Sequence, residues 1–124
     1  MSQTCPCGTG LDYNDCCGRF LDQGAYPQRA DLLMRSRFTA YVRRNRTYLI
    51  KTWHPDTCPA LTENDLNGTE WLTLEVITHH SGLKKATVEF KAWYQTPQGA
   101  QCHHERSLFK KVKNRWVYLN PIAE

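Results

Sequence analysis

The chain has 124 residues, which is enough for one compact domain with a small appendage but not for two full domains. Hydrophobic residues make up 40% of the sequence and charged residues 23%, so a core can form and a disordered chain is excluded. The formal net charge of +4 is small and argues only weakly for a nucleic-acid partner.

The first ten residues have neither the basic start nor the apolar run of a signal peptide. No stretch approaches the roughly 20 apolar residues that a membrane-spanning helix needs. We therefore expect a cytoplasmic protein, in which clustered cysteines indicate metal binding or catalysis before disulfides.

Residues 1–22 are rich in cysteine and glycine and carry too few aliphatic side chains to form a core. Their cysteines follow the pattern Cys-x-Cys, eight residues, Cys-Cys, at Cys5, Cys7, Cys16 and Cys17. Zn²⁺ prefers four tetrahedral ligands, and thiolates are favoured in structural sites. The spacing predicts one structural Zn²⁺ with no open coordination position. Disulfides and redox thiols are the alternatives, although a ring closed by two neighbouring cysteines would be strained.

Residues 27–46 are expected to form a helix, with Pro27 in its first turn. At 100° per residue, one face of this helix is apolar. That face comprises Ala30, Leu33, Met34, Phe38 and Tyr41. Arg37 lies in the middle of it, where a buried charge requires a partner. We expect Glu89 or Glu105 to form a structural salt bridge with Arg37; alternatively, Arg37 recognises an anion. Arg35 is expected at the surface.

A second short helix or an extension of the first is expected at 48–53, ending before His54-Pro55. Residues 57–68 form a loop or a short helix, which Thr62 can cap. Alternating and β-branched residues then predict four strands. These span residues 71–79, 86–95, 101–111 and 116–119. A helix followed by hairpin-linked strands predicts an α+β fold, with the helix against one face of a curved antiparallel sheet.

Basic residues gather in two segments of the sequence. The first group comprises Arg29, Arg35, Arg37, Arg43, Arg44, Arg46 and Lys51, and the second comprises Lys110, Lys111, Lys113 and Arg115. A solvated helix face and a charged hairpin explain both groups. The alternative is a contact surface for RNA or an acidic partner.

The run Cys5-Pro6-Cys7-Gly8-Thr9-Gly10, followed by Tyr13 and Cys16-Cys17-Gly18, resembles the SEC-C motif. This zinc knuckle is named for the C-terminus of the SecA preprotein-translocase ATPase. The resemblance implies that all four cysteines bind zinc. It also implies a small docking module for proteins or ribosomes.

The rest of the chain resembles the uncharacterised bacterial YchJ family. The segments that carry the resemblance are 33–41, 48–49, 52–55, 70–72 and 105–109. The resemblance implies a nuclear transport factor 2-like (cystatin-like) domain over residues 27–121, in which helices pack against a curved sheet and enclose a cone. The knuckle would then occupy residues 1–22.

Four polar residues are weak candidates for charge recognition or proton transfer in such a cone: Arg37, His54, Glu89 and Glu105. Trp53 is either a core residue or part of the mouth of the cone. His54 is either a general base or a loop residue that packs on Trp53.

Two histidine pairs, His79-His80 and His103-His104, lie on expected strands, where alternation directs one member of each pair to each face. A second metal site from these histidines is therefore disfavoured. Cys58 and Cys102 have no flanking nucleophile motif and are interpreted as spare thiols.

No phosphate-binding glycine loop, Gly-x-Ser-x-Gly elbow or HExxH motif is present in the sequence. The favoured hypothesis is an adaptor that docks to a protein or ribonucleoprotein through the knuckle and the basic helix. The alternative is a small-molecule binder or an isomerase- or dehydratase-like enzyme that uses the cone. RNA binding is a third and weaker hypothesis.

Overall fold

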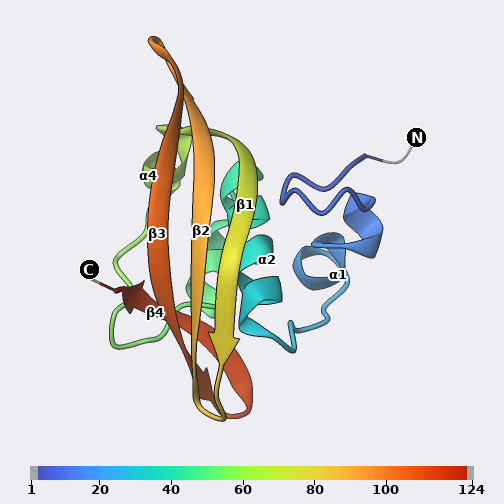
Figure 1. Cartoon of the computed structure of the whole chain (residues 1–124), viewed down its shortest axis with the longest axis vertical. Coiled ribbons are helices and arrows are strands. Elements are labelled where there is room, and N and C mark those ends of the chain that lie inside the picture. Colours follow the sequence, from blue (N-terminus) through green and yellow to red (C-terminus); the bar gives the residue numbers. More distant parts are fainter. Residues whose placement is uncertain (1–2, 123–124) are drawn as a thin grey trace.

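The structure is a computed structural model that describes residues 3–122, with the side chain of residue 63 excepted. The helical elements precede the strands along the chain (Figure 1). The helices are η1 (Tyr13–Asp15), α1 (Gly18–Leu21), α2 (Ala30–Val42), α3 (Arg46–Lys51) and α4 (Glu63–Asn67). The strands are β1 (Glu70–Ser81), β2 (Lys85–Thr96), β3 (Gly99–Val112) and β4 (Arg115–Pro121).

The four strands form one antiparallel meander in the order β1-β2-β3-β4, which confirms the α+β prediction and all four strands. Each strand is longer than its sequence pattern indicated. Lys113 and Asn114 both have positive φ, 51° and 66°, as a two-residue type I′ hairpin between β3 and β4 requires. Val88, Phe90 and Ala92 alternate along β2 and are buried on one face of the sheet.

The prediction of one helix over residues 27–46 is wrong at both ends. Pro27 is buried in the linker before α2, which begins at Ala30. Arg44 adopts φ 56°, a left-handed conformation that ends the helix, and α3 starts two residues later. The side chain of Asn45 caps α3 by accepting a hydrogen bond from the backbone N–H of Tyr48 at 3.1 Å. The predicted Thr62 cap is confirmed, because Thr62 and Asp65 form a capping box at α4.

α2 packs against β1, β2 and β4 and buries its apolar stripe there (Figure 1). The core between helix and sheet includes Leu33, Phe38, Val88, Phe90, Phe109 and Trp116. The cysteines form a separate buried cluster with Tyr13, and Phe20, Tyr48 and Leu49 belong to a third. α2 therefore lies at the centre of the fold, next to the sheet, the cysteine cluster and the third cluster. In residues 3–122, none of the helices is long and apolar enough to cross a membrane.

Candidate functional site

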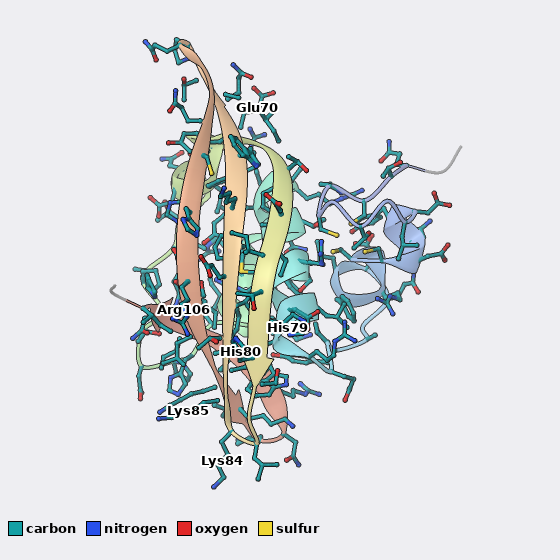
Figure 2. All side chains as sticks on the ribbon, in the orientation of Figure 1. Glu70, His79, His80, Lys84, Lys85 and Arg106 are labelled. Atoms are coloured by element: carbon teal, nitrogen blue, oxygen red, sulfur yellow. The ribbon has the colours of Figure 1, made fainter. Side chains whose placement is uncertain are left out.

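The four cysteines of the N-terminal segment come together at one point beside α2, where sulfur atoms gather in Figure 2. All four Sγ atoms lie within 4.8 Å of one another, and the Sγ atoms of Cys7 and Cys16 are 3.5 Å apart. Four thiolates bound at ~2.3 Å in a tetrahedron would be separated by roughly 3.8 Å. Each cysteine is at most 3% exposed. The group could therefore hold a metal ion after only a small adjustment.

The protonation of these thiols depends on their neighbours. Hydrogen bonds with Cys17 and Cys7 lower the pKa of Cys5, whereas hydrogen bonds with Cys5 and Cys7, together with burial, raise the pKa of Cys17. Burial raises the pKa of Cys16, although the hydroxyl of Thr9, with its Oγ1 3.2 Å from Sγ, acts in the opposite direction. Four thiolates in one buried site repel one another, so a bound cation would favour the fully deprotonated set.

The cysteine segment is fixed to the rest of the molecule by close contacts. Gly8 has φ 89°, and a Cβ atom there would collide with the carbonyl oxygen of Leu74 in β1. From α2, Arg35 donates to the carbonyl of Cys7 at 2.7 Å, and the guanidinium of Arg43 lies 3.7 Å from the centroid of the Tyr13 ring. Arg35 is thus half-buried in a contact, and the prediction that it lies free at the surface is wrong.

A cavity of about 200 Å³ lies between α2 and the inner face of the sheet. Its walls are mostly aromatic: Phe38, Tyr41, Trp53, Trp71, Phe90 and Tyr118. The charged and polar side chains in its lining are Arg37, His103, Glu105 and Ser107. The aromatic side chains leave this space open, as the small-molecule hypothesis requires.

Arg37 is 2% exposed, and its guanidinium is held without an ion pair. Its Nη1 donates to the carbonyl of Leu49 at 2.9 Å and to the hydroxyl of Thr52 at 2.8 Å. The rings of Trp53 and Tyr118 each have their centroid 4.7 Å from its Cζ atom. Burial lowers the pKa of Arg37, because the charged form loses its hydration. An arginine nevertheless stays protonated, so a full positive charge borders the cavity.

The expected salt bridge between Arg37 and Glu89 or Glu105 is wrong. Among the side chains that the structure describes, no carboxylate lies within 4.0 Å of the Arg37 guanidinium. Glu89 lies on the outer face of the sheet, where its Oε2 is 2.7 Å from Nε2 of His104. Glu105 does line the cavity, but its partners are other groups.

The Glu105 carboxylate lies among three polar side chains. It accepts hydrogen bonds from the hydroxyls of Ser107 and, at 3.2 Å, Tyr118, and its Oε1 is 3.0 Å from Nε2 of His103. Burial, with the nearby Glu105 charge, raises the pKa of Tyr118, so that its hydroxyl stays a donor. The roles of His103, Ser107 and Tyr118 were missed. On β3, the alternation of His103, Glu105 and Ser107 is the signal that places them on one face.

The other candidates lie apart from the cavity. His54 is a loop residue whose Nδ1 accepts from the backbone N–H of Asp56 at 3.0 Å, while its neighbour Trp53 lines the cavity. His79 and His80 both lie on β1 (Figure 2), and Nε2 of His79 is 3.9 Å from Asp31 in α2. Cys58 contacts the carbonyl of Pro59, and Cys102 is exposed. His54 and Glu89 therefore do not join Arg37 and Glu105 in one site.

Most cations of the first basic group are already engaged within the molecule. Arg29 pairs with Asp31 at 3.0 Å. Arg44 and Arg46 donate to the carbonyls of Leu66 and Leu61. Arg29, Arg43, Arg44 and Arg46 nevertheless remain exposed, so these contacts orient their guanidinium groups without removing the charges from the surface.

Two family models match the chain. The model described as YchJ, middle NTF2-like domain, matches residues 29–121, and the SEC-C motif matches residues 1–19. A UPF0225 protein of Haemophilus influenzae (strain PittEE) is 41% identical over 99% of this chain and 80% of its own length. A UPF0225 protein of Cupriavidus pinatubonensis is 47% identical over 94% of this chain and 85% of its own length.

Two solved structures share this architecture. The solution structure of a SEC-C motif containing protein from Rhodopseudomonas palustris matches with a TM-score of 0.89 and 31% identity, over 98% of this chain and 99% of that one. A crystal structure of such a protein from Psychrobacter arcticus matches with a TM-score of 0.83 and 36% identity, over 98% of this chain and 83% of that one. The chain therefore belongs to the uncharacterised UPF0225 (YchJ) family and combines a SEC-C motif with an NTF2-like domain.

Proposed function

We propose that this protein binds a small, largely apolar molecule with an anionic group in the cavity between α2 and the sheet. The observation that carries the proposal is the buried Arg37 guanidinium, which borders an open, aromatic-lined space without a carboxylate partner in the described residues. A buried charge is costly unless it is paired. An anionic ligand would supply the missing counter-charge.

The dimensions and walls of the cavity restrict the ligand further. A dry cavity of about 150 Å³ accepts benzene, so about 200 Å³ suits a single ring with one or two small substituents. The aromatic walls favour a flat body. Glu105, at the polar part of the lining, would accept a hydrogen bond from a donor group on the ligand.

We further infer that Cys5, Cys7, Cys16 and Cys17 hold one structural Zn²⁺. The all-sulfur set and the convergence of four buried Sγ atoms support zinc in a closed site. When bound, the ion would hold the short N-terminal segment in place. No chemistry in the cavity is assigned to it.

A second candidate is an isomerase- or dehydratase-like reaction in the same cavity. The contact between His103 and Glu105 favours it, because a carboxylate that orients an imidazole is a common proton-transfer arrangement. His54 and Glu89, which lie elsewhere, have no part in it. The docking-adaptor hypothesis has less support, because the basic residues of α2 are engaged in internal contacts.

Binding is tested with benzoate and with its neutral analogue benzamide, followed through the fluorescence of Trp53 and Trp71 in the cavity wall. We expect benzoate to bind at least roughly tenfold more tightly than benzamide. Arg37→Met should remove this preference, whereas Arg37→Lys should retain part of it. Arg106→Met is the matched control, because Arg106 is exposed on β3 outside the cavity (Figure 2).

Equal affinities for benzoate and benzamide, or a preference that survives Arg37→Met, would contradict the binding proposal. Native mass spectrometry of protein purified without chelator tests the metal, with one zinc per chain expected. If a small molecule co-purifies and is turned over, Glu105→Gln should abolish turnover while leaving binding intact. Unchanged turnover in that variant would exclude the second candidate.

A further inference from the structure

A groove of about 620 Å³ lies on the surface near Trp53, which lines both it and the cavity described above. We name it the Tyr26 groove. It runs between the linker before α2, the end of α3 and the β3–β4 hairpin, and its walls include Tyr26, Lys51, Trp53, Lys113, Arg115 and Val117. It is about three times as large as the cavity.

Cations from distant parts of the sequence converge on one ring in this groove. The hydroxyl of Tyr26 donates to the carbonyl of Trp116 at 2.6 Å, which holds the ring in place. The guanidinium of Arg115 lies 4.9 Å from the ring centroid, and the ammonium of Lys51 lies 5.8 Å from it. Lys113 adds a third positive charge to the walls. These cations repel one another, and the ring quadrupole offsets this only in part.

The described lining of the groove contains no carboxylate, so its charge is unbalanced. Lys51, Lys113 and Arg115 are all exposed, and none of them forms an ion pair with a described side chain. An anionic ligand would therefore gain favourable interactions from three side chains at once.

The rest of the lining is mostly aliphatic. Ile50 is 37% exposed, and Pro55, Val112 and Val117 lie in the same groove. Single-stranded nucleic acid needs aromatic faces on which bases stack. In this groove, Tyr26 already has two cations against its ring and Trp53 has the Arg37 guanidinium against its ring. A peptide that carries aliphatic side chains next to carboxylates therefore matches this lining better than a nucleic acid with its bases and phosphates.

We propose that the Tyr26 groove binds an acidic segment of a partner protein, in which carboxylates alternate with aliphatic side chains. Such a segment would place its carboxylates on Lys51, Lys113 and Arg115 and its aliphatic groups on Ile50 and Val117. The groove is separate from the ligand cavity, and the inference does not depend on what the cavity binds.

The test measures fluorescence anisotropy of a fluorescein-labelled peptide in which glutamate and leucine alternate. We expect binding that weakens as salt is added, because the ion pairs are at the surface. The double variant Lys51→Glu with Arg115→Glu should weaken binding by roughly tenfold or more. Arg106→Glu, which changes an exposed arginine of β3 outside the groove, should bind like the wild type (Figure 2). Circular dichroism checks that each variant is folded.

Two further probes separate the alternatives. A peptide in which glutamate and serine alternate should bind at least roughly tenfold more weakly, because it lacks the aliphatic groups. Single-stranded oligouridylate of equal charge should also bind more weakly. Tighter binding of the oligouridylate, equal binding of the two peptides, or an unchanged affinity in the double variant would each overturn the proposal.

Discussion

At the scale of single residues, a buried charge without an ionic partner is a functional candidate, whereas a buried charge with such a partner is structural. Arg37 is enclosed by two aromatic rings and neutral acceptors, so its charge is stabilised but not neutralised. Asp31 is equally buried, at 6% exposure, but its carboxylate receives two hydrogen bonds from Arg29, at 3.0 and 3.1 Å. The first residue remains available to an anion, whereas the second is already paired.

Asp31→Asn tests this difference through pH. Burial raises the pKa of Asp31, but the hydrogen bonds and charge of Arg29, with a contribution from His79, outweigh burial and lower it. A lowered folded-state pKa stabilises the protein above the unfolded value of about 3.9, and this contribution is lost as pH falls through the folded-state pKa. We expect the variant to be less stable by about 1 kcal/mol near neutral pH. Urea unfolding from about pH 7 to about pH 3 should show the difference shrinking.

Asp56→Asn is the control for this experiment, because the Asp56 side chain is 85% exposed. It should change stability little at any pH. A difference between Asp31→Asn and the wild type that stays constant over the pH range would show that the Asp31 carboxylate is not stabilised as described.

At the scale of elements, α2 presents different residues to three neighbours. Met34, Arg37 and Phe38 face the cavity, while Arg35 contacts the cysteine segment, as does Arg43 directly after the end of the helix. A third contact is made toward α3, where the hydroxyls of Ser36 and Tyr48 are 2.7 Å apart. Because neighbours surround this helix, polar residues outside its apolar stripe are buried as well. This explains why Arg35, which periodicity placed at the surface, is half-buried.

Substitutions at two glycines test how strongly the cysteine segment packs against β1. Gly8 and Gly10 have similar φ values, 89° and 84°, but only a Cβ at Gly8 would meet the Leu74 carbonyl. We expect Gly10→Ala to destabilise the protein by about 1 kcal/mol through backbone strain alone, and Gly8→Ala by at least about 2 kcal/mol. Urea unfolding of both variants provides the measurement. Equal losses would mean that the contact with Leu74 contributes nothing.

At the scale of the whole molecule, the N-terminal segment and the sheet both flank α2 (Figure 1). The N-terminal segment carries the cysteine cluster, and the cavity lies between α2 and the sheet. The hydroxyl of Thr39 lies 3.7 Å from Sγ of Cys5, and the adjacent Phe38 lines the cavity. A structural change at the cysteines can therefore shift α2 and so alter the shape of the cavity. Such coupling would make the knuckle part of the domain that binds the ligand.

Metal removal tests this coupling. We expect the Cys16→Ser variant to lose at least about 3 kcal/mol of stability, because metal binding contributes directly to folding. Its affinity for benzoate should also fall, by at least roughly tenfold. Cys102→Ser, a change at an exposed cysteine of β3, should leave both quantities unchanged. A less stable Cys16→Ser protein that still binds benzoate with wild-type affinity would show that the two regions are independent.

The sequence alone determined the features that depend on short-range periodicity. Alternation along residues 86–95 identified a strand and divided its side chains between two faces, because side chains on a strand change face at every step. The apolar stripe of residues 30–41 likewise identified α2. The cysteine spacing predicted a four-thiol cluster, because close pairs on a short loop can reach one point.

Only the tertiary structure decided which distant side chains meet. Lys51 and Arg115 share the Tyr26 ring, and Glu105 contacts Tyr118 in place of Arg37. These contacts depend on the packing of α2 and on bulges within β1 and between β3 and β4. A bulge shifts the register by one residue and bends the strand, and no short-range pattern encodes its position. The cluster and the core could thus be predicted from the sequence, whereas the cavity and the groove required the fold.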